Sequence, residues 1–246
     1  MKKILIILSL PLCLNLTGCD ILLPLLEGVA ESGVNLEPTN TEIIKGLKEA
    51  LVKGATYAVT NLNDEGGYFN DPLVKIPFPE DALFVANTLR DLGLGQMVDN
   101  FEKRLNEGAE KGAALALPIF KEAITGMSFA DGKQILLGGD NAATNYFRER
   151  TSTALTQAFS PVIKDKLDEV NATKLWTDIT TRYNRIPFIN KKVETDLVKY
   201  ATDKALAGLF LKLAEEEKLI RENPVERTSD LLRKVFGYAD QQMGGQ

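Results

Sequence analysis

Apolar side chains recur every three or four residues along most of this chain, the spacing that places them on one face of an α-helix. In the first strong example, Thr39 stands where a helix N-cap is expected, and Glu42 occupies the position that completes a capping box. The apolar face that follows consists of Ile44, Leu47, Leu51, Ala55, Ala58 and Leu62. No stretch of the sequence alternates apolar and polar residues over the length of a strand. The pattern therefore predicts an all-α protein with a single compact multi-helix domain.

Capping and turn residues divide the rest of the chain into further helices. The three prolines of "NDPLVKIPFPED", residues 70–81, favour an extended conformation instead. We expect helices at residues 80–93, 96–125 with a bend at Pro118, 129–137, 142–161, 164–184, 192–222 and 228–238. Residues 241–246 are expected to form a frayed tail.

Small residues form a stripe in the stretch "EGAEKGAALAL". Gly108, Gly112 and Ala116 stand four residues apart, so they share one edge of the predicted helix. In a bilayer this spacing marks helix dimerisation, whereas in a helix this rich in charge it allows a neighbouring backbone to pack closely. We expect close packing.

The N-terminus has the organisation of a signal peptide. Two lysines precede a run of thirteen mainly apolar residues, 4–16, which is too short to span a bilayer as a helix. The run ends in Leu16-Thr17-Gly18-Cys19, which resembles the lipobox of bacterial lipoproteins. The resemblance implies that residues 1–18 are removed and that the Cys19 thiol carries a diacylglyceryl group.

Lipidation at Cys19 sets the expected domain organisation and location. A lipidated tether, residues 19–38, precedes a helical domain, residues 39–240. Two or three acyl chains hold a protein durably at a membrane, so we expect an envelope protein that faces the periplasm. Asp20 resembles the residue that retains lipoproteins in the inner membrane of enteric bacteria. The alternatives are a conventional cleaved signal with a chance cysteine, and an uncleaved apolar N-terminus.

Composition excludes several classes of function. Without residues 1–18 the chain has 27 basic and 34 acidic residues, a net charge of −7, which disfavours nucleic acid as a partner. The chain has no histidine, so Ser-His-Asp and Cys-His catalysis and histidine-ligated metals are excluded. Residues 61–72 come nearest to an EF-hand loop, but Pro72 stands where a bidentate Glu is required. We therefore expect no metal and no cofactor.

The chain contains the stretches "GLKEALVKG", "VKIPFPED", "ADGKQILLGGDNAATNYFRERT" and "EKLIRENPVERTSDLLRKVFG". Together they resemble an uncharacterised family of Gram-negative envelope proteins, domain of unknown function 4197. The resemblance runs from about Thr41 to Gly237 and implies a helical, secreted or lipid-anchored protein, with no known reaction or ligand. Members often have Asn-Arg-Ala-Ala-Glu where this chain has "NEGAEKGA", so glycines here replace alanines on the close-packing stripe.

One group of polar residues is dense enough to be a candidate ligand or partner site. It comprises Asp131, Asp140, Asn141, Thr144 and Arg148. Asp140, Thr144 and Arg148 are spaced by four residues and follow one helical edge beside a Gly-Gly break, where free N–H groups favour an anion. The structural interpretation is that Asp131 forms a capping box with Ser128 at the start of one helix and that Asp140 or Asn141 caps the next.

Two functions of different class remain. The first is a non-catalytic envelope module that binds a lipid, peptide or protein partner, or a small ligand, in a groove. The second is a hydrolase that uses paired carboxylates. An apolar groove favours the first, and two buried acids about 5 to 10 Å apart favour the second.

Overall fold

The computed structural model describes residues 37–185, 192–194 and 196–244, apart from the side chains of Arg182 and Tyr183. The chain divides into two units, Met1–Glu37 and Pro38–Gln246, and the helices of the described residues all belong to the second. The predicted signal peptide, Cys19 and nearly all of the predicted tether lie outside the described residues. The described residues form helices, turns and loops without a strand, so the prediction of an all-α domain is confirmed.

The helices follow the chain in this order. They are α2 (Asn40–Asn63), the 3₁₀ turn η1 (Glu80–Ala82), α3 (Leu83–Asp91), α4 (Gly95–Ala113), α5 (Ala116–Thr125), α6 (Phe129–Leu136), α7 (Ala142–Asp168), α8 (Ala172–Asn184), α9 (Leu197–Glu222), η2 (Pro224–Glu226) and α10 (Asp230–Gly244). Thr39 and Glu42 form the expected capping box of α2, and Ser128 and Asp131 form the expected box of α6.

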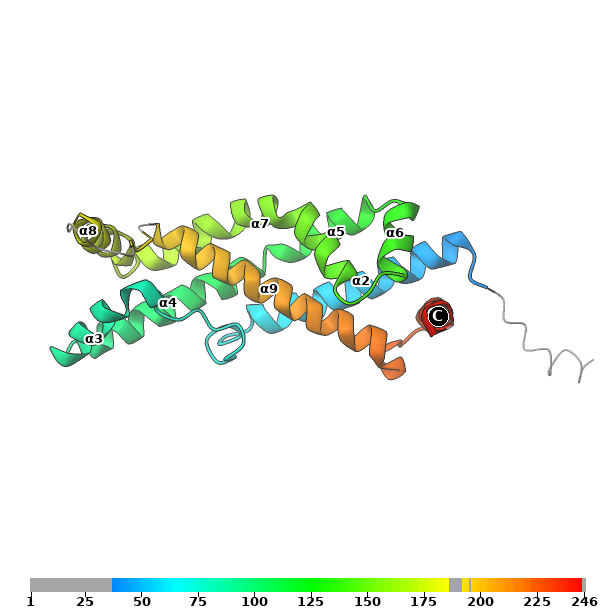
Figure 1. The fold of residues 1–246 in the computed structure, drawn as a ribbon, viewed down its shortest axis with the longest axis horizontal. Helices are drawn as coiled ribbons and strands as arrows, with labels where there is room; N and C mark the ends of the chain where they lie inside the picture. Colours follow the sequence, from blue (N-terminus) through cyan, green and yellow to red (C-terminus); the bar gives the residue numbers. More distant parts are fainter. Residues whose placement is uncertain (1–36, 186–191, 195, 245–246) are drawn as a thin grey trace, which may run out of the picture. The chain divides into compact units, whose positions relative to one another are not determined.

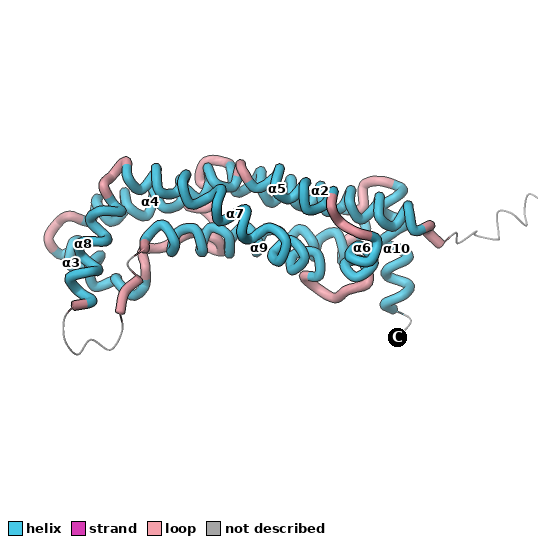
Figure 2. Tube along the Cα trace, turned by 90° about the horizontal axis from the view of Figure 1, so that it is seen from above, coloured by secondary structure: helices cyan, strands magenta, loops and turns pink. Residues whose placement is uncertain are grey.

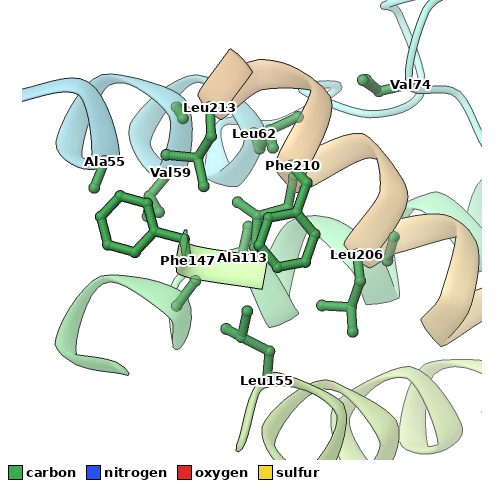
Figure 3. Packing of buried hydrophobic residues seen from close by; sticks show 14 of the residues in the cluster. Ala55, Val59, Leu62, Val74, Ala113, Phe147, Leu155, Leu206, Phe210 and Leu213 are labelled. Carbon is green, nitrogen blue, oxygen red and sulfur yellow. The ribbon is translucent and has the colours of Figure 1, made fainter. Parts of the chain in front are cut away.

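Within this unit, α7 packs against both α4 and α9, and α2 packs against α9, α5 and α10. Figures 1 and 2 show α3 and α8 at the end of the unit where α4 begins, with α6 and α10 at the opposite end. One continuous cluster of buried apolar side chains runs between the helices. Figure 3 shows its centre, where Phe147 of α7 and Phe210 of α9 meet Val59 and Leu62 of α2.

Two prolines act differently from the prediction. The expected single helix over 96–125 is two helices, and the break falls at residues 114–115 instead of at Pro118. Pro118 then lies in the first turn of α5, where its missing N–H has no helical partner to lose. Pro161 does not end α7, which continues to Asp168. Pro161 has no N–H to donate to the backbone carbonyl of Gln157. Because both residues are exposed, water can donate to that carbonyl instead.

The last helix also differs from the prediction. It was expected to end near Tyr238, ahead of a frayed tail at 241–246, but α10 continues to Gly244. Val235, Phe236 and Ala239 are buried, which fixes α10 against α2. The last two residues of the chain lie outside the described residues.

The glycine stripe of α4 packs against α7, as predicted. A Cβ at Gly112 would lie 2.6 Å from the Phe159 ring, and one at Gly108 would lie 3.0 Å from the Ile163 Cα. Ala116 is fully buried at the start of α5. The stripe therefore serves close approach of α4 and α7.

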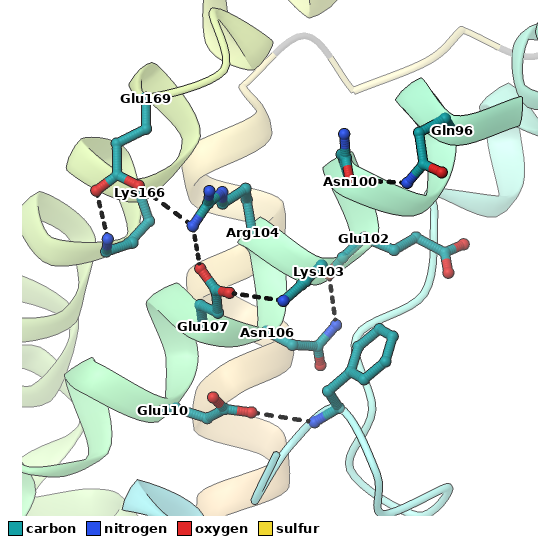
Figure 4. A network of polar contacts seen from close by, with 11 residues as sticks. Gln96, Asn100, Glu102, Lys103, Arg104, Asn106, Glu107, Glu110, Lys166 and Glu169 are labelled. Atoms are coloured by element: carbon teal, nitrogen blue, oxygen red, sulfur yellow. Dashed lines mark hydrogen bonds and ion pairs between the residues drawn. The ribbon is translucent and has the colours of Figure 1, made fainter. Parts of the chain in front are cut away.

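A ladder of polar side chains on α4 holds the connection between α2 and η1, residues 64–79 (Figure 4). The expected extended conformation of residues 70–81 is found only in part, because residues 72–74 form a turn and 80–82 form η1. Glu110 accepts hydrogen bonds from the backbone N–H groups of Tyr68 and Phe69, both at 3.2 Å. The fully buried Asn106 binds both the N–H and the carbonyl of Ile76, at 2.8 and 2.9 Å. These side chains take the place of a neighbouring strand, so a segment with three prolines is fixed without β-structure.

Among the described residues, no single helix has both the length and the apolar character needed to cross a bilayer. One pair bent by 109°, Gly95–Thr125 with Phe129–Leu136, passes by length and composition alone.

Candidate functional site

The α6–α7 junction holds the polar residues that the sequence singles out. Asp131 caps α6, accepting from the Ser128 hydroxyl at 2.7 Å and the Ser128 N–H at 3.0 Å. These hydrogen bonds and the Arg150 guanidinium, 3.7 Å away, lower the pKa of the Asp131 carboxyl. Asp131 is thus engaged in the structural role that its spacing predicts.

The cap of α7 differs from the prediction. Asn141 is the N-cap residue in a left-handed conformation, with φ 65°, and its side chain makes no capping hydrogen bond. Glu217 of α9 supplies the cap instead. Its carboxylate accepts from the Ala143 N–H at 3.0 Å, the Thr144 N–H at 2.9 Å and the Thr144 hydroxyl at 2.9 Å. The anion that a helix N-terminus favours is therefore a carboxylate of this chain.

Arg221 completes this arrangement one helical turn later. Its guanidinium donates to Glu217 at 2.8 and 2.9 Å, and to the carbonyls of Ile135 and Leu136 at 2.8 and 3.3 Å. The Glu217–Arg221 pair is largely buried, with side chains 7% and 11% exposed. It places a negative charge at the start of α7 and a positive charge at the end of α6, which suits both helix dipoles.

The structure separates the five predicted residues. Asp140 and Asn141 line a surface cavity of about 290 Å³ together with Glu217 and Arg221. Thr144 is buried beneath them, and Arg148 lies one turn along with its guanidinium 4.6 Å from the centre of the Phe210 ring. Asp131 does not line this cavity. Sequence reasoning missed Glu217 and Arg221, because their four-residue spacing resembles that of any exposed helical ion pair.

A second cavity, the apolar cavity, lies between α3, α4 and α8. Its volume is about 300 Å³. The wall includes Phe78, Val85, Leu89, Phe101, Trp176 and Ile179, and the polar members of the lining are Asn100 and Thr180. No charged residue lines it.

Three aromatic rings form one side of the apolar cavity. The ring centres of Phe78 and Phe101 are 4.8 Å apart, and Trp176 lies 5.7 and 6.0 Å from them. The Trp176 indole N–H donates to the Glu194 carbonyl at 2.9 Å, and the Thr180 hydroxyl donates to the Trp176 carbonyl at 2.7 Å. Since both polar groups are already bonded within the protein, the wall offers a ligand mainly apolar contact.

Large apolar side chains are also exposed beside this cavity. We call four of them the apolar rim: Leu92 is 69% exposed, Met97 50%, Leu175 47% and Ile179 40%. Leu83, Phe84 and Leu94 of the same region are also exposed. A cavity with such a rim is typical of a binding surface. The sequence signal was present in "LFVANTLRDLGLGQM", which has apolar residues on more than one helical face.

The buried acids of the described residues serve the fold. Glu110 and Glu217 both accept hydrogen bonds from backbone N–H groups. Burial raises the pKa of Glu216, and the nearby Glu226 adds to this effect, but Glu216 lines neither cavity described above. Within the described ranges, no group of three or more Cys, Asp or Glu residues could hold a metal ion.

Comparison with known proteins gives one match. The model of a family described as "Protein of unknown function (DUF4197)" matches residues 37–237. No curated protein and no solved structure matches the chain.

Proposed function

Since the chain belongs to this family of unknown function, membership assigns no activity, and we propose a function from the apolar cavity. The helical unit is a non-catalytic module that binds an apolar ligand, a lipid above all, in this cavity. Lipid on Cys19 holds it at a membrane of the bacterial envelope, facing the periplasm.

The apolar cavity is the observation that carries the proposal. Large exposed apolar patches usually mark binding sites. The space of about 300 Å³ lined by Phe78, Phe101 and Trp176 opens to solvent past the exposed side chains of Met97 and Ile179. Its size is at the lower end of small-molecule sites, which span about 300–1,000 Å³. Because the wall lacks charge, its ligand must be largely apolar.

The membrane location rests on the first residues of the sequence. The positive start, the short apolar run and the lipobox-like Leu16-Thr17-Gly18-Cys19 support cleavage before Cys19 and acylation of its thiol. The net charge of −7 that remains disfavours binding to anionic head groups through the protein surface, so the acyl chains supply the attachment.

The alternative, a carboxylate-dependent hydrolase, has less support. A paired-acid mechanism needs one carboxyl free to give a proton and another free to act as base or nucleophile. The strongly buried Glu110 and Glu217 already accept backbone hydrogen bonds, and Glu217 also pairs with Arg221. The apolar cavity contains no acid.

Two measurements test the proposal. Metabolic labelling with a fatty acid should mark the wild-type protein and not the Cys19→Ser variant, which should also leave the membrane fraction. Equal labelling of both would refute the anchor.

The binding module is tested separately. The purified domain from residue 20 onward should bind the apolar fluorophore N-phenyl-1-naphthylamine with saturation. Absence of saturable binding would refute the apolar site.

A further inference from the structure

The volume of the apolar cavity limits what it can hold. An apolar cavity of about 150 Å³ accommodates one benzene molecule, with six carbon atoms. By that measure the space of about 300 Å³ holds roughly ten to twelve carbon atoms. A peptide helix, about 10–12 Å across with its side chains, needs an open groove and does not fit such a space.

The wall determines which end of a ligand enters. An ionised or strongly polar group inside this cavity would lose its water without gaining a partner, because the lining contains no charge. The buried part of the ligand must therefore be hydrocarbon. Met97 and Ile179 belong both to the wall and to the exposed rim, so apolar contact continues from the interior to the surface.

One polar group lies at the surface end of the cavity. Asn100 is exposed and lines the cavity, and its Oδ1 accepts from Gln96 Nε2 at 3.1 Å (Figure 4). This bond leaves the Asn100 amide N–H groups as donors for a carboxylate or ester oxygen. The order from the buried to the exposed part of the lining is thus hydrocarbon wall first and then the hydrogen-bond donor Asn100 beside the apolar rim.

From this order we infer that the ligand of the apolar cavity is an amphiphile with one unbranched acyl chain of about ten to twelve carbons. The chain lies against Phe78, Phe101 and Trp176, and the acyl oxygens lie at Asn100. This inference rests on the proposed function and narrows it. A fatty acid, a monoacylglycerol and a lysophospholipid share this chemistry, and the experiment below distinguishes them.

Trp176 makes the test direct, because it is the only tryptophan of the chain. A fatty acid brominated near its end should quench Trp176 fluorescence with saturation, since the bromine reaches the aromatic wall. Unlabelled fatty acids should displace the brominated one, and their affinity should rise roughly fourfold per methylene up to about twelve carbons and then level off. Displacement that keeps strengthening to sixteen carbons would overturn the inference, because the chain would not be enclosed.

Head groups are compared at a fixed chain of twelve carbons. Similar binding of dodecanoate, monolauroylglycerol and lauroyl lysophospholipid supports recognition of the chain and acyl oxygens alone, whereas preference for one of them identifies its source. If N-phenyl-1-naphthylamine binds but no acyl chain displaces it, the proposed function stands and the acyl inference is wrong. If neither binds, both are wrong.

Variants place the site. Val85→Phe and Leu89→Phe each add volume to the half-buried part of the wall and should weaken dodecanoate binding at least tenfold. Val225→Phe, at a position 81% exposed and outside the cavity, is the matched control and should leave binding unchanged. Unchanged binding in both wall variants, with unaltered melting curves, would overturn the inference.

Two other occupants of the apolar cavity, a segment of this chain and a second copy of it, would give different results. Residues 186–189 read Ile-Pro-Phe-Ile and lie outside the described residues. Phe188→Ser should leave dodecanoate affinity within about twofold, and a tenfold gain would show that this chain competes for its own cavity, which overturns the inference. Concentration-dependent dimerisation abolished by Ile179→Ser, without fatty-acid binding, would identify a second copy as the occupant and overturn it as well.

Discussion

The α6–α7 junction buries charged side chains, whereas the region formed by α3, α4 and α8, called the α3–α8 region, exposes large apolar ones. At the junction, the side chains of Glu217 and Arg221 are largely buried, and their hydrogen bonds go to the start of α7, to the end of α6 and to each other. In the α3–α8 region, Leu92 and Leu175 are exposed to solvent and the adjoining space is unfilled by the described residues. The first region is arranged as a stable protein core requires, and the second is not.

The two regions differ in how completely they are packed. Of the five polar residues predicted as a site, Asp131 and Thr144 take part in helix-end contacts, whereas Asn141 makes no side-chain cap and Arg148 lies against Phe210. The apolar residues near Trp176, which the sequence did not single out, border an unfilled space instead. The dense polar group of the sequence therefore does not coincide with the exposed apolar surface on which the proposed function rests.

The largest effect should come from removing the acid of the junction. Glu217→Ala leaves the guanidinium of Arg221 buried without its partner and frees two N–H groups of α7. We expect a loss of about 3–5 kcal/mol in the free energy of unfolding, measured by urea denaturation. Glu222→Ala is the matched control on the same helix, because its pair with Lys218 is exposed. It should cost no more than about 0.5 kcal/mol. Equal effects would remove the contrast between the regions.

Acid should affect the α2–α10 contact, near the junction, before the α3–α8 region. Hydrogen bonds from Lys234 of α10 and from Thr39 lower the pKa of Glu42 from 4.5 to about 2. A lowered pKa in the folded state means that Glu42 stabilises the fold above pH 4.5 and that this contribution is lost as the pH falls toward 2. Hydrogen exchange of α10 should increase in that window. The apolar cavity has no titratable lining, so binding of N-phenyl-1-naphthylamine there should stay constant until global unfolding.

The acid prediction has a control variant. In Glu42→Gln, α10 should already exchange faster at pH 7, and its exchange should depend less on pH between 4.5 and 2. An unchanged pH profile would show that another group controls the contact.

A smaller effect is expected in the α3–α8 region. Ile179→Ser removes an apolar side chain that is 40% exposed, so the free energy of unfolding should change by less than about 1 kcal/mol. Binding of N-phenyl-1-naphthylamine should nevertheless weaken severalfold, because Ile179 lines the cavity. A large loss of stability would mean that the rim belongs to the core.

The smallest effect concerns Asp140, one of the two residues expected to cap α7. Asp140 is exposed, and the cap of α7 comes from Glu217, so Asp140→Ala should stay within about 0.5 kcal/mol of wild type. Arg148→Ala should cost slightly more, about 0.5–1 kcal/mol, because its guanidinium stacks on Phe210. Thermal melts measure both. A loss of in-cell complementation by stable variants would restore the candidate polar site.

Sequence predicts this fold well where the determining contacts are local. The capping boxes of Thr39 with Glu42 and of Ser128 with Asp131 span three residues, so both were predicted and confirmed. The cap of α7 joins Thr144 to Glu217, 73 residues away, and no local pattern contains that contact. The glycine stripe predicted close packing because, in a charged helix, residues without a side chain mainly allow a neighbouring helix to approach.

The cavity could not be predicted for a related reason. Phe78, Phe101 and Trp176 come from three separate segments and each fits an ordinary buried position in its own helix or loop. Only the angle and spacing of α3, α4 and α8 leave a space between them. Such spacing depends on the whole set of packed side chains and not on periodicity.

The 73-residue separation between Thr144 and Glu217 also has a consequence for biogenesis. During synthesis α6 and α7 leave the ribosome well before α9, and until α9 arrives the ends of both helices lack the groups that satisfy them. The α6–α7 hairpin therefore cannot complete its native structure as a nascent intermediate, and it waits for a late, long-range closure. The proposed export of the chain would gain from that delay, because the central helices mature only after nearly all of the chain has been made.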